Sequence, residues 1–211
     1  MHQPQPPQRS ALDYFPARIT YKRLQEASLG CQGCDLYKLG TQTVFGEGPE
    51  DARVMMVGEQ PGNDEDLQGH PFVGPAGRLL DKALVDAGID RQTVYVTNAV
   101  KHFKWKPAGK RRLHQKPAAS EVAACKPWLY GELEVIHPEI VVCLGATAAQ
   151  SMIGPSFRVT KMRGQWLEFE DGQKLIATIH PSAILRTPGE DREQEYRHFV
   201  ADLSLVAKAI A

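Results

Sequence analysis

Residues 53–62 read Arg-Val-Met-Met-Val-Gly-Glu-Gln-Pro-Gly, an apolar run that stops abruptly at Gly58. A run that is apolar on both faces and rich in branched residues is typical of a strand buried in a parallel sheet. Three further runs share the pattern, namely residues 94–97 before Asn98, 140–144 before Gly145 and 175–179 before His180. The sequence therefore predicts four parallel strands.

Longer stretches with helical spacing separate these runs. They cover residues 76–87, 118–135 and 146–153, and a last one covers about 191–210. Alternating strands and helices predict a three-layer α/β domain, with helices on both faces of the sheet. The first ten residues are rich in Gln and Pro, so we expect a disordered tail over residues 1–15 and one domain over 16–211.

The composition of the 211 residues is that of an ordinary globular protein, with 42% hydrophobic and 24% charged residues and a formal net charge of zero. No apolar run is long enough for a membrane span, and no signal peptide is evident, so we expect a protein of the bacterial cytosol. Its four cysteines should be reduced, so their grouping indicates a metal site. No feature suggests an interface, and we expect a monomer.

Residues 101–120 concentrate positive charge, with seven Lys or Arg, two His and no carboxylate. Basic residues interleaved with aromatic ones are typical of a nucleic-acid backbone contact, although a solvated loop has the same composition. A histidine among such contacts, His114, would lie beside the sugar, where an imidazole can act as nucleophile or base. The candidate phosphate contacts are Lys101, Lys110, Arg111 and Arg112.

Polar side chains follow the predicted strands at the edge where α/β sheets bind ligands. Glu59, Asn98 and His180 supply an acid, an amide and an imidazole, and Phe72 adds an aromatic ring in the turn 69–74. An amide can read the edge of a nucleobase through its paired donor and acceptor, while a ring stacks on the face of the base. These four residues are candidates for a base-binding pocket.

Four segments together resemble the family-4 uracil-DNA glycosylases, and the likeness runs from about residue 27 to the C-terminus. They are Gly-Glu-Gln-Pro-Gly at 58–62, Pro-Phe-Val-Gly-Pro-Ala-Gly-Arg-Leu-Leu at 71–80, Thr-Asn-Ala-Val-Lys at 97–101 and His-Pro-Ser at 180–182. The resemblance implies the three-layer α/β/α uracil-DNA glycosylase fold with a central four-stranded parallel sheet, and a [4Fe-4S] cluster.

Two departures from the family pattern resemble the UdgX branch, which becomes covalently trapped on uracil-containing DNA. Gln60 stands where the family has Ala, and residues 110–114 read Lys-Arg-Arg-Leu-His. The likeness implies that His114 attacks C1′ of the sugar, that Glu59 orients it or takes its proton, and that Gln60 holds the loop. Ser182 and Leu185 would contact the DNA backbone and fill the gap that the flipped base leaves in the base stack.

The same resemblance implies a uracil pocket at the strand ends. Gly58 and Phe72 would line it, with the ring of Phe72 stacked on the base. Asn98 would pair with the O4/N3 edge, and His180 would stabilise the charge that develops on O2 as the glycosidic bond breaks. Asp64 and Asp66 are left without an assigned role.

The cysteines leave two ligand sets open. Cys31 and Cys34 form a CxxC pair, and Cys125 and Cys143 follow much later. Four Cys would be the simplest set, but Cys143 lies within an apolar strand, where a cysteine is commonly a buried hydrophobe. The family has its third cysteine where this chain has His102, so Cys31, Cys34, His102 and Cys125 are the preferred set. Zinc also accepts Cys₃His, and the iron–sulfur assignment rests on the resemblance.

The sequence thus predicts a uracil-DNA glycosylase that becomes linked to its product site through His114. A single-stranded substrate is favoured, because the base must leave the stack to be cut. Two alternatives remain: a conventional multiple-turnover glycosylase, and a non-catalytic iron–sulfur protein that binds single-stranded DNA.

Overall fold

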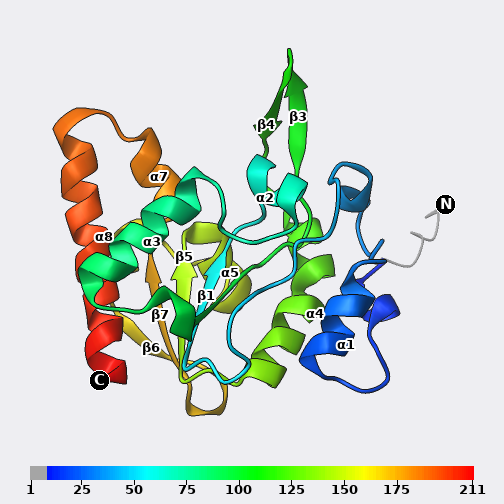
Figure 1. The fold of residues 1–211 in the computed structure, drawn as a ribbon, viewed down its shortest axis with the longest axis horizontal. Helices are drawn as coiled ribbons and strands as arrows, with labels where there is room; N and C mark the ends of the chain where they lie inside the picture. The colour runs from blue at the N-terminus through cyan, green and yellow to red at the C-terminus, as the bar shows by residue number, and fades with distance from the viewer. Residues whose placement is uncertain (1–8) are drawn as a thin grey trace.

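The computed structural model describes residues 9–211, so the part of the predicted tail at 1–8 lies outside the described residues. Its centre is a sheet in the order β2-β1-β5-β7-β6, in which neighbours pair in parallel except for β6 (Figure 1). The four predicted parallel strands are confirmed as β1 (Val54–Gly58), β2 (Val94–Asn98), β5 (Ile140–Leu144) and β7 (Lys174–Thr178).

The predicted four-stranded parallel sheet is confirmed, with one further strand at its edge that the sequence did not predict. β6 (Trp166–Glu168) pairs antiparallel with β7 at the edge of the sheet. It has three residues, none of them fully buried, so it lacks the apolar run by which the other strands are recognised. The sheet is therefore mixed, with its parallel part carrying the strand ends of interest.

Helices cover both faces of the sheet, as predicted, and lie on opposite sides of it in Figure 1. Alternate strand residues such as Met56 and Val96 pack with α3 (Pro75–Ala87), α7 (Pro181–Arg186) and α8 (Gly189–Ile210). The residues between them, such as Met55 and Tyr95, pack with α4 (Ala119–Ile136) and α5 (Ala146–Met152). The four predicted helices begin and end within two residues of their expected bounds.

Within the stretch predicted as a disordered tail, the structure describes a short helix from Ala11 onward. Ser10 caps the 3₁₀ helix η1 (Ala11–Tyr14), Ala11 is fully buried, and Phe15 stacks on Trp128 with ring centroids 4.8 Å apart. These apolar side chains join a third cluster, between α1 (Tyr21–Ser28) and α4. The free energy gained by burying these apolar side chains favours the helix over a disordered chain.

The remaining elements are short. The basic segment, predicted as a loop, is an antiparallel hairpin of β3 (Trp105–Ala108) and β4 (Arg111–His114) that projects from the body near α2 (Figure 1). Gly109 adopts a φ of +61° at its tip. Among residues 9–211, no helix is long and apolar enough to cross a membrane. The other elements are η2 (Asp35–Lys38), α2 (Asn63–Gln68), η3 (Arg91–Thr93), α6 (Val159–Met162) and η4 (Glu170–Gly172).

Candidate active site

Three residues of the predicted pocket meet at the carboxyl ends of β1 and β2. Gly58 and Asn98 are partners in the parallel register of these strands. A Cβ atom on Gly58 would collide with Oδ1 of Asn98 and lie 2.7 Å from Cζ of Phe72. Phe72 itself has a φ of +57°, a strained value for an aromatic residue. Glycine at position 58 is therefore what allows the amide and the ring both to lie against this point of the backbone.

His180 is the N-cap of α7 and lies beside Phe72, with the two rings stacked at 6.2 Å between centroids. Its Nδ1 accepts a hydrogen bond of 3.1 Å from the backbone N–H of Ser182. A backbone N–H only donates, so Nδ1 carries a lone pair and the proton of the neutral ring is on Nε2. Burial lowers the pKa of His180 to about 4, against the opposing charge of Glu59. His180 is thus a neutral hydrogen-bond donor near neutral pH.

Glu59 joins the sheet to the hairpin. One carboxylate oxygen lies 3.2 Å from Nε2 of His114, and the other accepts a hydrogen bond from the Thr147 hydroxyl. Burial alone would raise the pKa of Glu59, but the hydrogen bonds from His114 and Thr147 outweigh it and hold this pKa below its ordinary value. The ionised carboxylate can therefore orient His114 or accept its proton.

Thr147 was missed as a functional residue in the sequence. It lies in the first turn of α5, directly after Gly145 at the end of β5. The rule that ligands bind beyond the strand ends already selects this segment. The sequence does not show, however, which group the hydroxyl of a threonine there will bond. Only the fold shows that Thr147 reaches Glu59, which lies 88 residues earlier in the chain.

Gln60 fastens the base of the hairpin. Its Nε2 donates to the carbonyl oxygens of Lys104 at 3.2 Å and Gln115 at 3.1 Å, and its Oε1 accepts from the Lys104 N–H at 3.1 Å. These residues flank the two strands and are themselves joined by a hydrogen bond of 2.9 Å. One side-chain amide therefore holds both ends of the hairpin, a geometry that alanine at this position cannot provide.

Arg112 joins the hairpin to α2. Its Nη1 lies 2.6 Å from the fully buried carboxylate of Asp66, and its Nε donates to the Asn63 side chain at 2.8 Å. The guanidinium is thereby engaged within the protein, whereas Lys110 and Arg111 are exposed at the tip of the hairpin. Asp66, which the sequence left without a role, anchors the arm that carries His114.

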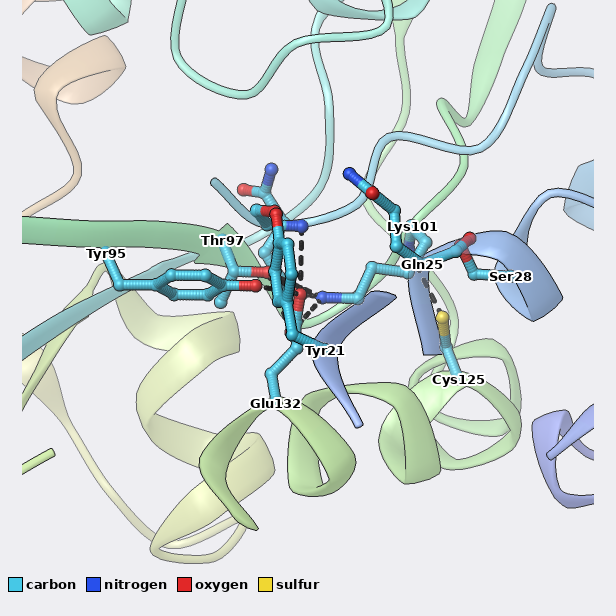
Figure 2. Close-up of polar contacts among 10 residues, drawn as sticks. Tyr21, Gln25, Ser28, Tyr95, Thr97, Lys101, Cys125 and Glu132 are labelled. Carbon is cyan, nitrogen blue, oxygen red and sulfur yellow. Dashed lines mark hydrogen bonds and ion pairs between the residues drawn. The ribbon is translucent and has the colours of Figure 1, made fainter. Parts of the chain in front are cut away.

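The prediction that Lys101 contacts DNA is wrong. Its side chain is fully buried beneath the turn after β2, with Nζ 2.5 Å from Glu132, 2.6 Å from the Thr97 hydroxyl and 2.9 Å from the Asn98 carbonyl (Figure 2). An ammonium that donates in three directions inside the protein has no N–H left for a phosphate. Its partner Glu132 lies 31 residues later, so no local pattern in the sequence indicates the pair.

Two further DNA-contact candidates lie on α7, close to His180. Ser182 places its hydroxyl 2.8 Å from Nδ1 of His180 and accepts a hydrogen bond of 3.2 Å from Arg186. Leu185 is partly exposed on the same helix. Ser182 therefore supports the histidine ring directly.

Three predicted cysteine ligands share one buried region. The sulfur of Cys31 accepts a hydrogen bond of 3.2 Å from Nε1 of Trp128, and the sulfur of Cys125 accepts one of 3.2 Å from the Lys101 N–H. Cys34 packs against the same apolar cluster. Burial raises the pKa of Cys125 to about 12, against the lowering effect of Lys101. Cysteine sulfur is the donor type that iron–sulfur clusters use.

His102 lies at the edge of this region. It is buried, its Nε2 is 3.1 Å from the Thr43 hydroxyl, and it lines a cavity of about 140 Å³ together with Cys31. Cys143 instead faces the other core, with its sulfur 3.6 Å from that of Met152. Within residues 9–211, no three His, Cys, Asp or Glu side chains are already grouped as a metal site. The region therefore supplies the donor type that a cluster uses, but these side chains are not grouped around one point.

Comparison with known proteins points to one family. The family model described as Uracil DNA glycosylase superfamily matches residues 45–204. The chain is 40% identical over 173 residues to the type-4 uracil-DNA glycosylase of Thermotoga maritima, covering 82% of this chain and 84% of that protein. It is also 40% identical over 174 residues to the type-4 uracil-DNA glycosylase of Archaeoglobus fulgidus, covering 79% and 84%.

Proposed function

The chain belongs to the uracil-DNA glycosylase superfamily, and from this premise we propose that it excises uracil from DNA and remains joined to the sugar through His114. The observation that carries the second part is the contact of 3.2 Å between His114 and Glu59. It places an imidazole from the hairpin next to a carboxylate that directly follows β1. An adjacent acid that orients an imidazole is the usual means of activating it as a nucleophile.

Uracil must leave the base stack to enter the pocket. In this proposal it stacks on Phe72, and the amide of Asn98 pairs with its O4 and N3 positions. The Nε2–H of neutral His180 donates to O2, where negative charge develops as the glycosidic bond lengthens. A fixed donor in a buried site stabilises such charge without reorganising at the moment of reaction.

Bond breaking and capture then follow in sequence. The C1′–N1 bond breaks, uracil leaves with the bonding electrons, and positive charge develops on the sugar at C1′. A ring nitrogen of neutral His114 donates its lone pair to C1′ and forms the new bond. The proton on the other ring nitrogen passes to Glu59 or to water, and uracil takes a proton from water. The adduct therefore forms without an external reactant.

We also propose that the DNA is bound as a single strand by a cytosolic, monomeric protein. Flipping a base from a single strand costs less than extracting it from a duplex. Lys110 and Arg111 are exposed at the tip of the hairpin and are available for phosphates. The projecting hairpin would bring them beside the strand whose base occupies the pocket.

For the cofactor, we propose a [4Fe-4S] cluster held by Cys31, Cys34, His102 and Cys125. Bound there, it would cross-link the N-terminal region, the turn after β2 and α4. The position of Cys143 in the opposite core favours this set over one of four cysteines. His102→Ala should bleach the visible absorption of anaerobically purified protein, and Cys143→Ala should leave this absorption unchanged. The reverse pattern would mean that Cys143 replaces His102 in the ligand set. Metal analysis would separate iron from zinc.

A denaturing gel of the protein mixed with a uracil-containing oligonucleotide tests the main proposal. We expect a shifted band that is stable to heat and detergent. His114→Ser should lose this band completely while still releasing uracil, because the serine cannot replace the imidazole as nucleophile. Free abasic product in excess over protein would support the conventional multiple-turnover alternative, and an untouched oligonucleotide would support the binding protein.

A further inference from the structure

Beneath the proposed pocket lies an ion pair that the chemistry above does not use. The side chains of Lys101 and Glu132 are both 0% exposed, and their charged atoms are 2.5 Å apart (Figure 2). Removing two charges from water costs much of what their attraction returns, so a buried pair is a weak source of stability. Its location is therefore more informative than its strength.

The carboxylate of Glu132 is held by a shell of donors. Its Oε1 accepts from the Gly46 N–H at 2.9 Å, from the Tyr95 hydroxyl at 3.2 Å and from the Thr97 hydroxyl at 2.9 Å. Burial and the charge of Glu132 both raise the pKa of Tyr95, so its phenol stays a donor. The carboxylate is thereby fixed in position on α4, facing the end of β2.

Lys101 transmits that position to the turn that carries Asn98. Its Nζ donates to the Asn98 carbonyl at 2.9 Å, while its own carbonyl accepts from the Val44 N–H at 2.8 Å. The N–H groups of Ala99 and Val100 donate to the carbonyls of Gly58 and Glu59, at 2.9 and 3.1 Å. Those hydrogen bonds tie the turn to β1, and the ammonium ties its first residue to the core.

We propose that Lys101 and Glu132 are positioning residues for uracil recognition, which hold the main chain of Asn98 so that its amide stays above Gly58. This inference rests on the proposed function, because it concerns how the same pocket is aligned. The close approach of Asn98 and of Phe72 to Gly58 leaves little tolerance for movement. A small displacement of a recognition group can lower a rate strongly without weakening the fold.

The test replaces the pair by neutral side chains, because loss of one partner would leave an uncompensated buried charge. In Lys101→Met/Glu132→Gln, the amide keeps an acceptor for Gly46 and Tyr95, but the bond to the Asn98 carbonyl is lost. Uracil release is measured with protein in excess over the oligonucleotide, at a series of protein concentrations. We expect the rate at saturation to fall about tenfold, with the half-saturating concentration changed less than twofold, because no phosphate contact is altered.

A matched control removes an ion pair of similar chemistry at the other end of β1. Arg53 and Glu139 lie 2.7 Å apart and are exposed, so Arg53→Met/Glu139→Gln should leave the saturating rate unchanged. Far-UV circular dichroism and cluster absorption verify that both variants are folded and loaded. If Lys101→Met/Glu132→Gln does not fold, Lys101→Gln/Glu132→Gln, which gives residue 132 a polar partner, takes its place.

The outcomes separate this inference from the proposed function. If the wild-type protein releases no uracil, the proposed function is wrong. If the wild type is active and the folded double variant releases uracil at the wild-type saturating rate, the pair is only structural and the inference is overturned. A slower saturating rate in the double variant, with the control unchanged, supports it.

Discussion

The pocket floor and the hairpin arm are built in contrasting ways. The floor, defined as Gly58, Phe72, Asn98 and His180, lies at strand and helix ends and is largely buried. The arm, defined as β3 and β4, stands away from the body (Figure 1). Its last residue is His114, whose side chain is 49% exposed. Side chains of the body hold the arm at three places: Gln60 at its base, Asp66 and Asn63 at Arg112, and Glu59 at His114.

This difference indicates that base removal and capture of the sugar are separable. The floor would carry the removal, which must come first, and the arm would carry the capture, which depends on it. A change in the floor should therefore lower uracil release and adduct formation together. A change in the arm should lower the adduct alone.

The largest effect in the floor is expected from His180→Asn. Asparagine keeps the capacity to cap α7 but lacks the ring that places Nε2–H in the pocket. Loss of one preorganised donor typically slows a reaction about a hundredfold. Uracil release and adduct formation, measured by quench-flow and by gel, should fall by the same factor. If the yield of adduct is unchanged while the rate of uracil release falls, the two steps do not both depend on the floor.

A smaller effect is expected in the arm from Gln60→Ala. It removes three hydrogen bonds from the base of the hairpin, each worth about 1 kcal/mol. The ratio of adduct to released uracil should fall about tenfold while the release rate stays constant. Gln150→Ala, which removes an amide bonded to the Phe157 carbonyl, serves as the control. An equal fall in both quantities for Gln60→Ala would contradict the separation.

The smallest effect concerns the pH dependence of stability. The unfolded chain binds a proton on His180 near pH 6.5, but the folded protein binds it only near 4, so between these values the unfolded state binds more protons. Stability is therefore lost as the pH falls from 6.5 towards 4. Urea unfolding at pH 7 and pH 5 should show a larger loss for the wild type than for His180→Asn. Equal losses would mean that His180 is not held neutral by the floor.

The sequence predicted the floor better than its supports. The strand ends that bear Asn98 and His180 follow from local apolar runs, and the family resemblance supplied their roles. Thr147, Asp66 and Glu132 could not be assigned in the same way, because each acts through a partner far away in the chain. The same limit applies to Lys101, because its charge in the sequence indicates a contact with DNA, whereas the fold buries it beside Glu132.

The hairpin register also restricts how the length of this segment can change in evolution. Arg112 and His114 are two residues apart on β4, so they face the same side of the hairpin, one towards Asp66 and the other towards Glu59. One extra codon between them would turn one of the two side chains to the opposite side. An extra codon after Gly109, at the tip, would leave both in place. Among related sequences with both Arg112 and His114, the length of the hairpin should therefore vary at the tip, while the spacing between these two residues stays fixed.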